Sequence, residues 1–158
     1  MRNVLLSLSA VFFVGLVACN NKGESDTTVR SMSATIKRNS ADSPVTWNAD
    51  AAKVEARIPF KGSVRFLGSQ YKSNPTSMDM FVNNYKGKGV YPLYQGSAVQ
   101  TDSNSVKLTY LGRDFASIKG SVEIIEDNAE YYIGRFTFTG SNLDDTITVS
   151  NGSFTIAK

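Results

Sequence analysis

The chain has 158 residues, a formal net charge of +3, one cysteine and no histidine. Without histidine it lacks the commonest general base at neutral pH, the commonest metal ligand and every Ser-His-Asp or Cys-His arrangement. The charge surplus is small and the basic residues are scattered, so we expect no nucleic-acid partner. The length suits one domain with a hydrophobic core.

The first 18 residues predict a signal peptide. Arg2 supplies a positive charge, and residues 4–17 form an apolar stretch. This stretch is shorter than the about 20 apolar residues that a membrane-spanning helix needs. It leads into Leu16-Val17-Ala18-Cys19, which resembles the box that directs lipid attachment in bacterial lipoproteins. We therefore expect residues 1–18 to be removed and Cys19 to carry the lipid that holds the protein on a membrane.

A linker is predicted to follow. Residues 19–31, which begin with the cysteine, contain a single aliphatic residue among mostly polar ones, a composition typical of a flexible stalk. The domain then occupies residues 32–158. Asn20 stands where, in some bacteria, an aspartate retains lipoproteins at the inner membrane. Its presence favours the outer membrane of a bacterial cell envelope.

Apolar and polar residues alternate along most of the domain, which is the pattern of half-buried strands. The alternating stretches before the C-terminal part are residues 31–37, 54–60, 64–66, 78–82 and 106–110. No stretch shows the 3.6-residue period of a helix, although we expect a short helical turn near residues 114–117. Helix content should therefore be low.

Loop lengths predict how neighbouring strands pair, because a slip of one residue would turn every side chain to the other face. A three-residue loop places Ile58 opposite Phe66. A loop at residues 127–129 likewise places Ile124 opposite Tyr132. In both pairings the apolar faces of the two strands coincide.

The strongest short hairpin signal is Asn151-Gly152. Both central residues of a type I′ turn need positive φ, which asparagine and glycine tolerate. Such a turn would set Val149 against Phe154. We therefore predict three consecutive antiparallel strands in the last forty or so residues, with a turn at this dipeptide.

The same region resembles a family of small bacterial lipoproteins whose shared domain has no assigned activity. The resemblance rests on residues 120–125, 133–140 and 146–154, which include Gly-x-Phe-x-Phe and Asn-Gly-x-Phe motifs. Residues 32–36 with Trp47 are similar to the opening of that family, and residues 87–93 resemble its middle. Arg135 departs from the pattern, which has a small polar residue there. The resemblance implies an all-β fold and brings no activity, cofactor or site.

The densest aromatic and basic segment supplies the candidate ligand-binding residues, which are Tyr85, Lys86, Lys88, Tyr91 and Tyr94. Tyrosine rings and lysines in a loop can stack on sugar rings or bases. Rim aromatics can equally cap the end of a sheet. The segment is therefore the predicted binding site, with structural capping as its alternative.

The acidic residues predict neither a metal site nor a catalytic pair. Three of the five residues 126–130 are acidic, but they lack the ordered spacing of a calcium loop. Glu55, Asp79 and Glu123 fall on the polar sides of their strands, whereas the carboxyl pair of a glycoside hydrolase faces a cleft. We expect no catalytic residue, no metal and no cofactor.

These observations predict one antiparallel β domain of about eight to ten strands, a sandwich or a flattened barrel. The function they favour is non-catalytic binding of a ligand or partner, an envelope protein or a glycan, by a domain tethered to a membrane. Two alternatives stay open. One is a structural protein that binds an envelope partner edge to edge, and the other is a carboxylate-dependent hydrolase.

Overall fold

The computed structural model describes residues 29–71, 75–94 and 103–158. Within them lie ten strands and one short 3-10 helix, η1 (Ala51–Lys53). The strands are β1 (Ser31–Arg38), β2 (Val45–Asn48), β3 (Glu55–Arg57), β4 (Ser63–Gln70), β5 (Thr76–Asn83), β6 (Gly89–Tyr94), β7 (Ser105–Tyr110), β8 (Arg113–Asp127), β9 (Tyr131–Ser141) and β10 (Thr146–Ala157). The all-β prediction is confirmed. The predicted signal peptide, Cys19 and the start of the stalk lie outside the described residues.

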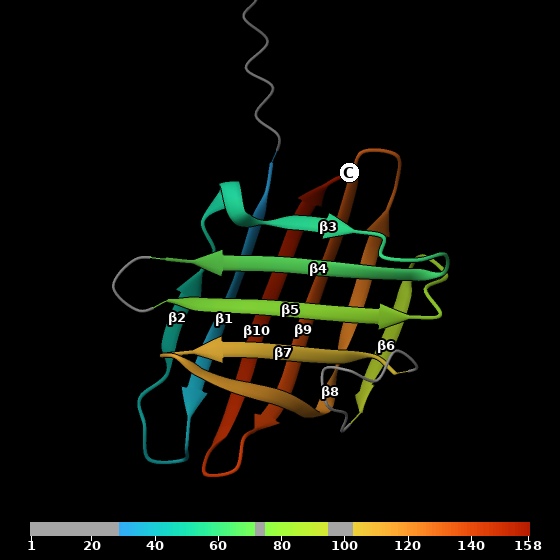
Figure 1. Cartoon of the computed structure of the whole chain (residues 1–158). Coiled ribbons are helices and arrows are strands. Elements are labelled where there is room, and N and C mark those ends of the chain that lie inside the picture. Colours follow the sequence, from blue (N-terminus) through green and yellow to red (C-terminus); the bar gives the residue numbers. More distant parts are fainter. Residues whose placement is uncertain (1–28, 72–74, 95–102) are drawn as a thin grey trace, which may run out of the picture.

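All ten strands belong to one antiparallel sheet that curls over itself. Their order is β2-β1-β10-β9-β8-β7-β5-β4-β3, and β6 pairs with β8 off this path. Figure 1 shows β3, β4, β5 and β7 as a front layer that crosses a back layer of β2, β1, β10, β9, β8 and β6 at a steep angle. The curled sheet thus forms a half-barrel with its core between the two layers.

The curl depends on β8, which is the longest strand. One edge of β8 pairs with β9, and the other edge pairs first with β7 and then with β6. The register with β9 shifts between Ser117 and Lys119, where the other edge changes partner. Next to it, Gly120 has a φ of 142°, and an added Cβ would lie 2.2 Å from the Thr137 carbonyl oxygen. Only glycine fits this bend.

Alternate residues of both layers fill the core. Phe66 of β4 joins the layers, because its ring centroid lies 4.7 Å from that of Phe154 and 5.4 Å from that of Tyr132. Trp47 of the edge strand β2 is 2% exposed, and its indole N–H has no hydrogen-bond partner in the described part of the chain. The predicted core residues of β1, β5 and β7 are also buried: Met32, Ala34, Ile36, Met78, Met80, Val82, Val106 and Leu108.

The strand before the first predicted hairpin is shorter than expected. β3 ends at Arg57, and Ala56 rather than Ile58 pairs with Phe66. Ile58 and Phe60 are 67% and 44% exposed, so their assignment to a buried face is wrong. The chain leaves the sheet after β3, and alternation beyond that point no longer reports which face is buried.

β8 differs from its prediction in two respects. Residues 114–117 are strand rather than a helical turn. Ile124 pairs with Gly134 rather than Tyr132, because the turn lies later in the chain than predicted. The side-chain oxygen of Asn128 accepts hydrogen bonds from the backbone N–H groups two and three residues on, at 2.9 and 2.8 Å, and so fixes the turn there.

The predicted hairpin at Asn151-Gly152 is wrong. β10 runs through this dipeptide, and its register with β9 shifts between Val149 and Gly152. Phe154 therefore pairs with Gly134 and not with Val149. Asn151 does have a positive φ, of 51°. Because β9 offers a continuous partner to both halves of β10, this conformation makes a bulge in the strand instead of reversing the chain.

A tight two-residue turn occurs instead at Leu111-Gly112. Tyr110 and Arg113 pair across it, and the two turn residues have φ values of 52° and 75°. Positive φ at both central positions is what a type I′ turn requires. Leucine is strained in this conformation. Its side chain is 44% exposed, so packing does little to offset the strain.

We therefore expect Leu111→Asn to stabilise the protein. Asparagine tolerates positive φ better than leucine, so the free energy of unfolding should rise by about 1 kcal/mol. Urea titration of both proteins measures the change. Leu143→Asn is the matched control, since Leu143 is fully exposed and lacks a positive φ. A Leu111→Asn protein no more stable than this control would contradict the strained turn.

Candidate functional site

The five predicted site residues do not form a single site. Tyr85 belongs to a cluster of polar and aromatic side chains. Its hydroxyl donates a hydrogen bond of 2.8 Å to Oδ2 of Asp127, and Nζ of Lys158 pairs with Oδ1 of the same carboxylate. The Lys158 ammonium also lies 4.4 Å from the ring centroid of Tyr132, which meets the Tyr85 ring edge to face at 6.2 Å. Tyr85 thus closes one end of the core.

Protonation in this cluster is settled by burial and hydrogen bonding. Burial, and then the bond to Asp127, raise the pKa of Tyr85 far above its usual range. Burial alone would raise the pKa of Asp127, but the hydrogen bonds from Lys158 and Tyr85 outweigh it and lower the pKa. Tyr85 therefore stays protonated at physiological pH and serves as a donor. It is not set up to act as a base.

The contacts of Tyr91 are also mainly structural. Its ring stacks on that of Tyr85 at a centroid distance of 5.7 Å. Its hydroxyl donates to the Gly87 carbonyl at 2.7 Å and accepts from the Lys86 backbone N–H at 3.1 Å. These bonds shape the loop between β5 and β6, and the side chains of Lys86 and Lys88 are exposed on it.

Tyr94 points the other way, because alternation along β6 turns Tyr91 and Leu93 inward and Tyr94 outward. It is 56% exposed. A hollow of about 270 Å³ lies beside it, and its lining residues are Asn83, Asn84, Tyr91, Tyr94, Ser103 and Asn104. We call this the tyrosine–asparagine hollow. Of the five predicted residues it includes Tyr91 and Tyr94, and not Tyr85, Lys86 or Lys88.

Asn104 holds the hollow together and has no signal in the sequence. Its amide nitrogen donates to the Pro92 carbonyl at 2.9 Å, and its amide oxygen accepts from the backbone N–H of Asn83 at 2.8 Å. The backbone N–H of Tyr94 donates to its carbonyl at 3.4 Å. Asn104 therefore ties the end of β5 in the front layer to β6 in the back layer.

Several polar groups of the hollow make no hydrogen bond within the described part of the protein. The Oγ atom of Ser103 is buried and has no hydrogen-bond partner among the described residues. The side chains of Asn83, Asn84 and Tyr94 make no hydrogen bond to another described residue. Their amides and hydroxyls can donate or accept, and the Tyr94 ring offers an exposed face.

The acidic residues that a hydrolase would need are engaged elsewhere. Each of the three candidates pairs with an arginine on the outer face of a layer, as Glu55–Arg57, Asp79–Arg65 and Glu123–Arg135. Burial raises the pKa of Asp79, although the charges of Arg65, Lys107 and Arg57 oppose the shift. Within the described ranges, no group of three or more acidic or cysteine side chains is arranged to hold a metal ion.

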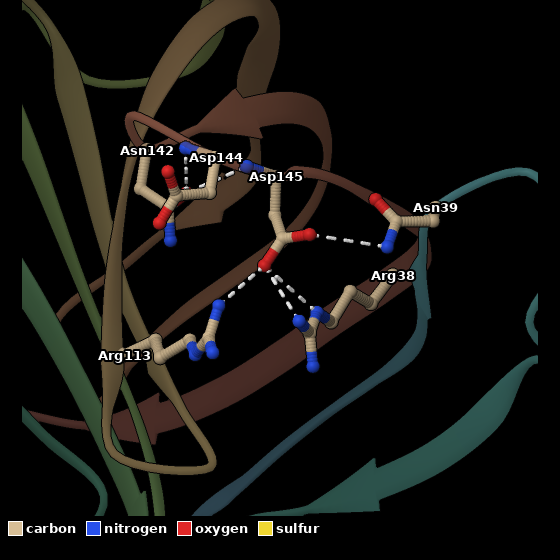
Figure 2. A network of polar contacts seen from close by, with 6 residues as sticks. All are labelled: Arg38, Asn39, Arg113, Asn142, Asp144 and Asp145. Atoms are coloured by element: carbon tan, nitrogen blue, oxygen red, sulfur yellow. Dashed lines mark hydrogen bonds and ion pairs between the residues drawn. The ribbon is translucent and has the colours of Figure 1, made fainter.

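A second polar cluster surrounds Asp145 in the turn between β9 and β10 (Figure 2). Oδ2 of Asp145 accepts from Nη2 of Arg38 at 2.6 Å and from Nη1 of Arg113 at 2.7 Å. Oδ1 accepts from the amide of Asn39 at 3.2 Å. The side-chain oxygen of Asn142 fixes the turn by accepting from two backbone N–H groups at 2.9 and 2.8 Å. This carboxylate links β1, β8 and the last hairpin, so the cluster is a structural tie.

Comparison with known proteins adds no further constraint. No protein-family model, curated protein or solved structure matches the chain. The resemblance to the lipoprotein family therefore stays a prediction. In the part of the chain that the structure describes, no helix is long and apolar enough to cross a bilayer.

The Asp145 cluster predicts a pH-dependent contribution to stability. The hydrogen bond from Asn39 and the bonds and charge of Arg38 lower the pKa of Asp145, against the effect of its partial burial. A folded-state pKa below the unfolded value of about 3.9 means stabilisation above about pH 4. That stabilisation is lost as the pH falls through the folded-state pKa.

Asp145→Asn should therefore unfold at a lower urea concentration than the wild type at pH 7, and the two midpoints should converge under acid conditions. Asp144→Asn is the matched control, because the Asp144 side chain makes no ion pair with another described residue. A gap between Asp145→Asn and the wild type that does not depend on pH would contradict the assigned role of the carboxylate.

Proposed function

We propose that the chain is a lipid-anchored domain of a bacterial envelope that binds a ligand or partner without catalysis. Cys19 is the proposed anchor, and the outer membrane is the proposed destination. The tyrosine–asparagine hollow is the proposed binding site. The observation that carries the proposal is that uncommitted polar groups and an exposed tyrosine ring gather in a hollow beside the predicted segment.

The character of the hollow supports binding rather than chemistry. The described residues that line it are uncharged: three asparagines, two tyrosines and one serine. Amides and hydroxyls fix the orientation of a ligand, whereas general acid and base catalysis needs a group whose pKa lies near the working pH. Of the described ionisable groups close to it in the chain, Tyr85 is hydrogen-bonded to Asp127, and Lys86 and Lys88 are exposed on the β5–β6 loop.

The proposed anchor predicts that Cys19→Ser releases the protein from membranes without unfolding it. Acyl chains contribute about 0.8 kcal/mol for each buried methylene, so losing them removes the attachment. Cell fractionation shows where the protein is, and circular dichroism of the purified variant checks the fold. Asn20→Ser, which leaves the cysteine in place, should remain on the membrane. A wild-type mass without acyl chains, or a Cys19→Ser protein still on the membrane, would refute the anchor.

The proposed site predicts that Tyr94→Ala weakens capture of the ligand or partner by the tethered protein. Replacing the ring removes its exposed stacking face, and alanine substitution of stacking aromatics typically costs about 1–3 kcal/mol, or fivefold or more in affinity. Affinity purification from intact cells, followed by mass spectrometry, quantifies what copurifies. Tyr71→Ala is the matched control, since Tyr71 is 67% exposed and is not part of the hollow. Equal capture by the two variants would argue against this site.

A further inference from the structure

A second hollow lies on the outer face of the back layer, where the Asn151 bulge interrupts the regular sheet. Its volume is about 220 Å³. Five polar residues, Ser121, Glu123, Arg135, Thr137 and Asn151, line it together with Phe136 and Gly152. We call it the bulge hollow. Bulges redirect side chains out of a strand's alternation and recur beside functional sites.

The hollow depends on Gly152. An added Cβ at this position would lie 2.4 Å from the Phe136 ring and 2.5 Å from its carbonyl oxygen. Glycine therefore lets β10 approach β9 directly after the bulge, while Asn151 stays exposed at the surface. In the Asn-Gly pair, Asn151 thus supplies the positive φ of the bulge, and Gly152 permits the close approach of β10 to β9.

Arg135 and Glu123 face one another across β9 and β8 at this hollow. Nε of Arg135 lies 2.6 Å from Oε2 of Glu123, and the two side chains are 66% and 30% exposed. The terminal guanidinium nitrogens and Oε1 make no hydrogen bond to another described residue. The side chains of Asn151 and Ser121 likewise make no hydrogen bond to any residue that the structure describes. Donors and acceptors therefore stand side by side, facing outward.

The ion pair belongs to a longer polar row. Ser33, Ser153, Arg135 and Glu123 are successive cross-strand partners on β1, β10, β9 and β8. The Ser33 and Ser153 hydroxyl oxygens lie 3.2 Å apart. Strands are about 4.8 Å apart, so the row extends about 14 Å across the sheet. In the neighbouring row, Thr137 of β9 pairs with Ser121 of β8.

Charge balance limits what this surface can bind. Glu123 neutralises Arg135, so an anion would meet a carboxylate beside the guanidinium and gain little. A cation would be opposed by the arginine in the same way. A neutral ligand rich in hydroxyl groups can instead use both members of the pair, because it offers donors and acceptors together.

We propose that the bulge hollow and the row through it bind a neutral glycan chain lying across β1, β10, β9 and β8. Oε1 of Glu123 accepts from sugar hydroxyls, and the free guanidinium nitrogens of Arg135 donate to sugar oxygens. The Asn151 amide does both, and the serine hydroxyls extend the contact along the row. This inference does not rest on the lipid anchor or on the tyrosine–asparagine hollow.

The test uses the purified full chain on an array of neutral and acidic glycans, followed by solution titration with the neutral oligosaccharide that binds most strongly. Arg135→Ala should weaken this binding tenfold or more, and Glu123→Gln should weaken it as well. Asn151→Gly keeps the positive φ of the bulge and removes only the amide, so it should weaken binding without loss of fold. Arg57→Ala is the matched control, because Arg57 is 63% exposed and pairs with a glutamate away from the hollow. It should bind like the wild type.

Circular dichroism and urea midpoints identify any variant that fails to fold. If Arg135→Ala fails to fold, the binding of Asn151→Gly decides the test instead. The proposal is overturned if no neutral glycan binds the wild type. It is also overturned if acidic glycans or inorganic phosphate bind more tightly than neutral glycans and Glu123→Gln increases the affinity for these anions, since the hollow would then be an anion site. Neutral-glycan binding that is lost in Tyr94→Ala but unchanged in the bulge-hollow variants overturns it too, because it would place the sugar at the tyrosine–asparagine hollow.

Discussion

One edge of β8 has to satisfy its backbone hydrogen bonds with two different strands, and the rest of the fold depends on this. β7 pairs with the first part of that edge and β6 with a later part, while β9 pairs with the opposite edge from Ala116 to Asp127. A buried backbone group left unpaired would be costly, so both partners must be present. Since the two partners belong to different layers, the sheet divides at β8 and folds over its own face (Figure 1).

Both candidate sites follow from this division. β6 extends the back layer beyond β8, and its alternation leaves Tyr94 outside while Tyr91 packs against the core. The other side of β8 holds Glu123 opposite Arg135. The front layer packs against the inner face of the back layer. The outer face of the back layer is therefore left exposed. Sequence alternation predicted strands, and the pairing of β8 decides which outward residues meet.

The sequence predicted the class of fold and most of the buried faces, because a period of two survives errors in register. The predicted pairing of Ile124 was wrong by two residues, yet the same face stayed buried. That error matters for the site, since in the predicted register Arg135 would lie opposite Ser121 and not Glu123. The partners of Tyr85 could not be predicted either, because Asp127 is 42 residues away along the chain.

Turns were harder to predict, because the same backbone conformation has different results in different surroundings. Asn151-Gly152 has the composition of a type I′ turn but lies against the continuous strand β9, and becomes a bulge. Leu111-Gly112 lacks that composition, yet it reverses the chain because β7 and β8 must pair immediately on either side. Local preference decides between a turn and a bulge only when tertiary pairing permits both.

Interstrand nuclear Overhauser contacts along β8 test the divided edge most directly. The account predicts contacts between Leu108 and Phe115 and between Tyr91 and Val122, on the same edge of one strand in one molecule. Contacts from β7 that continue along β8 beyond Ala116, or a β6 paired with any strand other than β8, would contradict it.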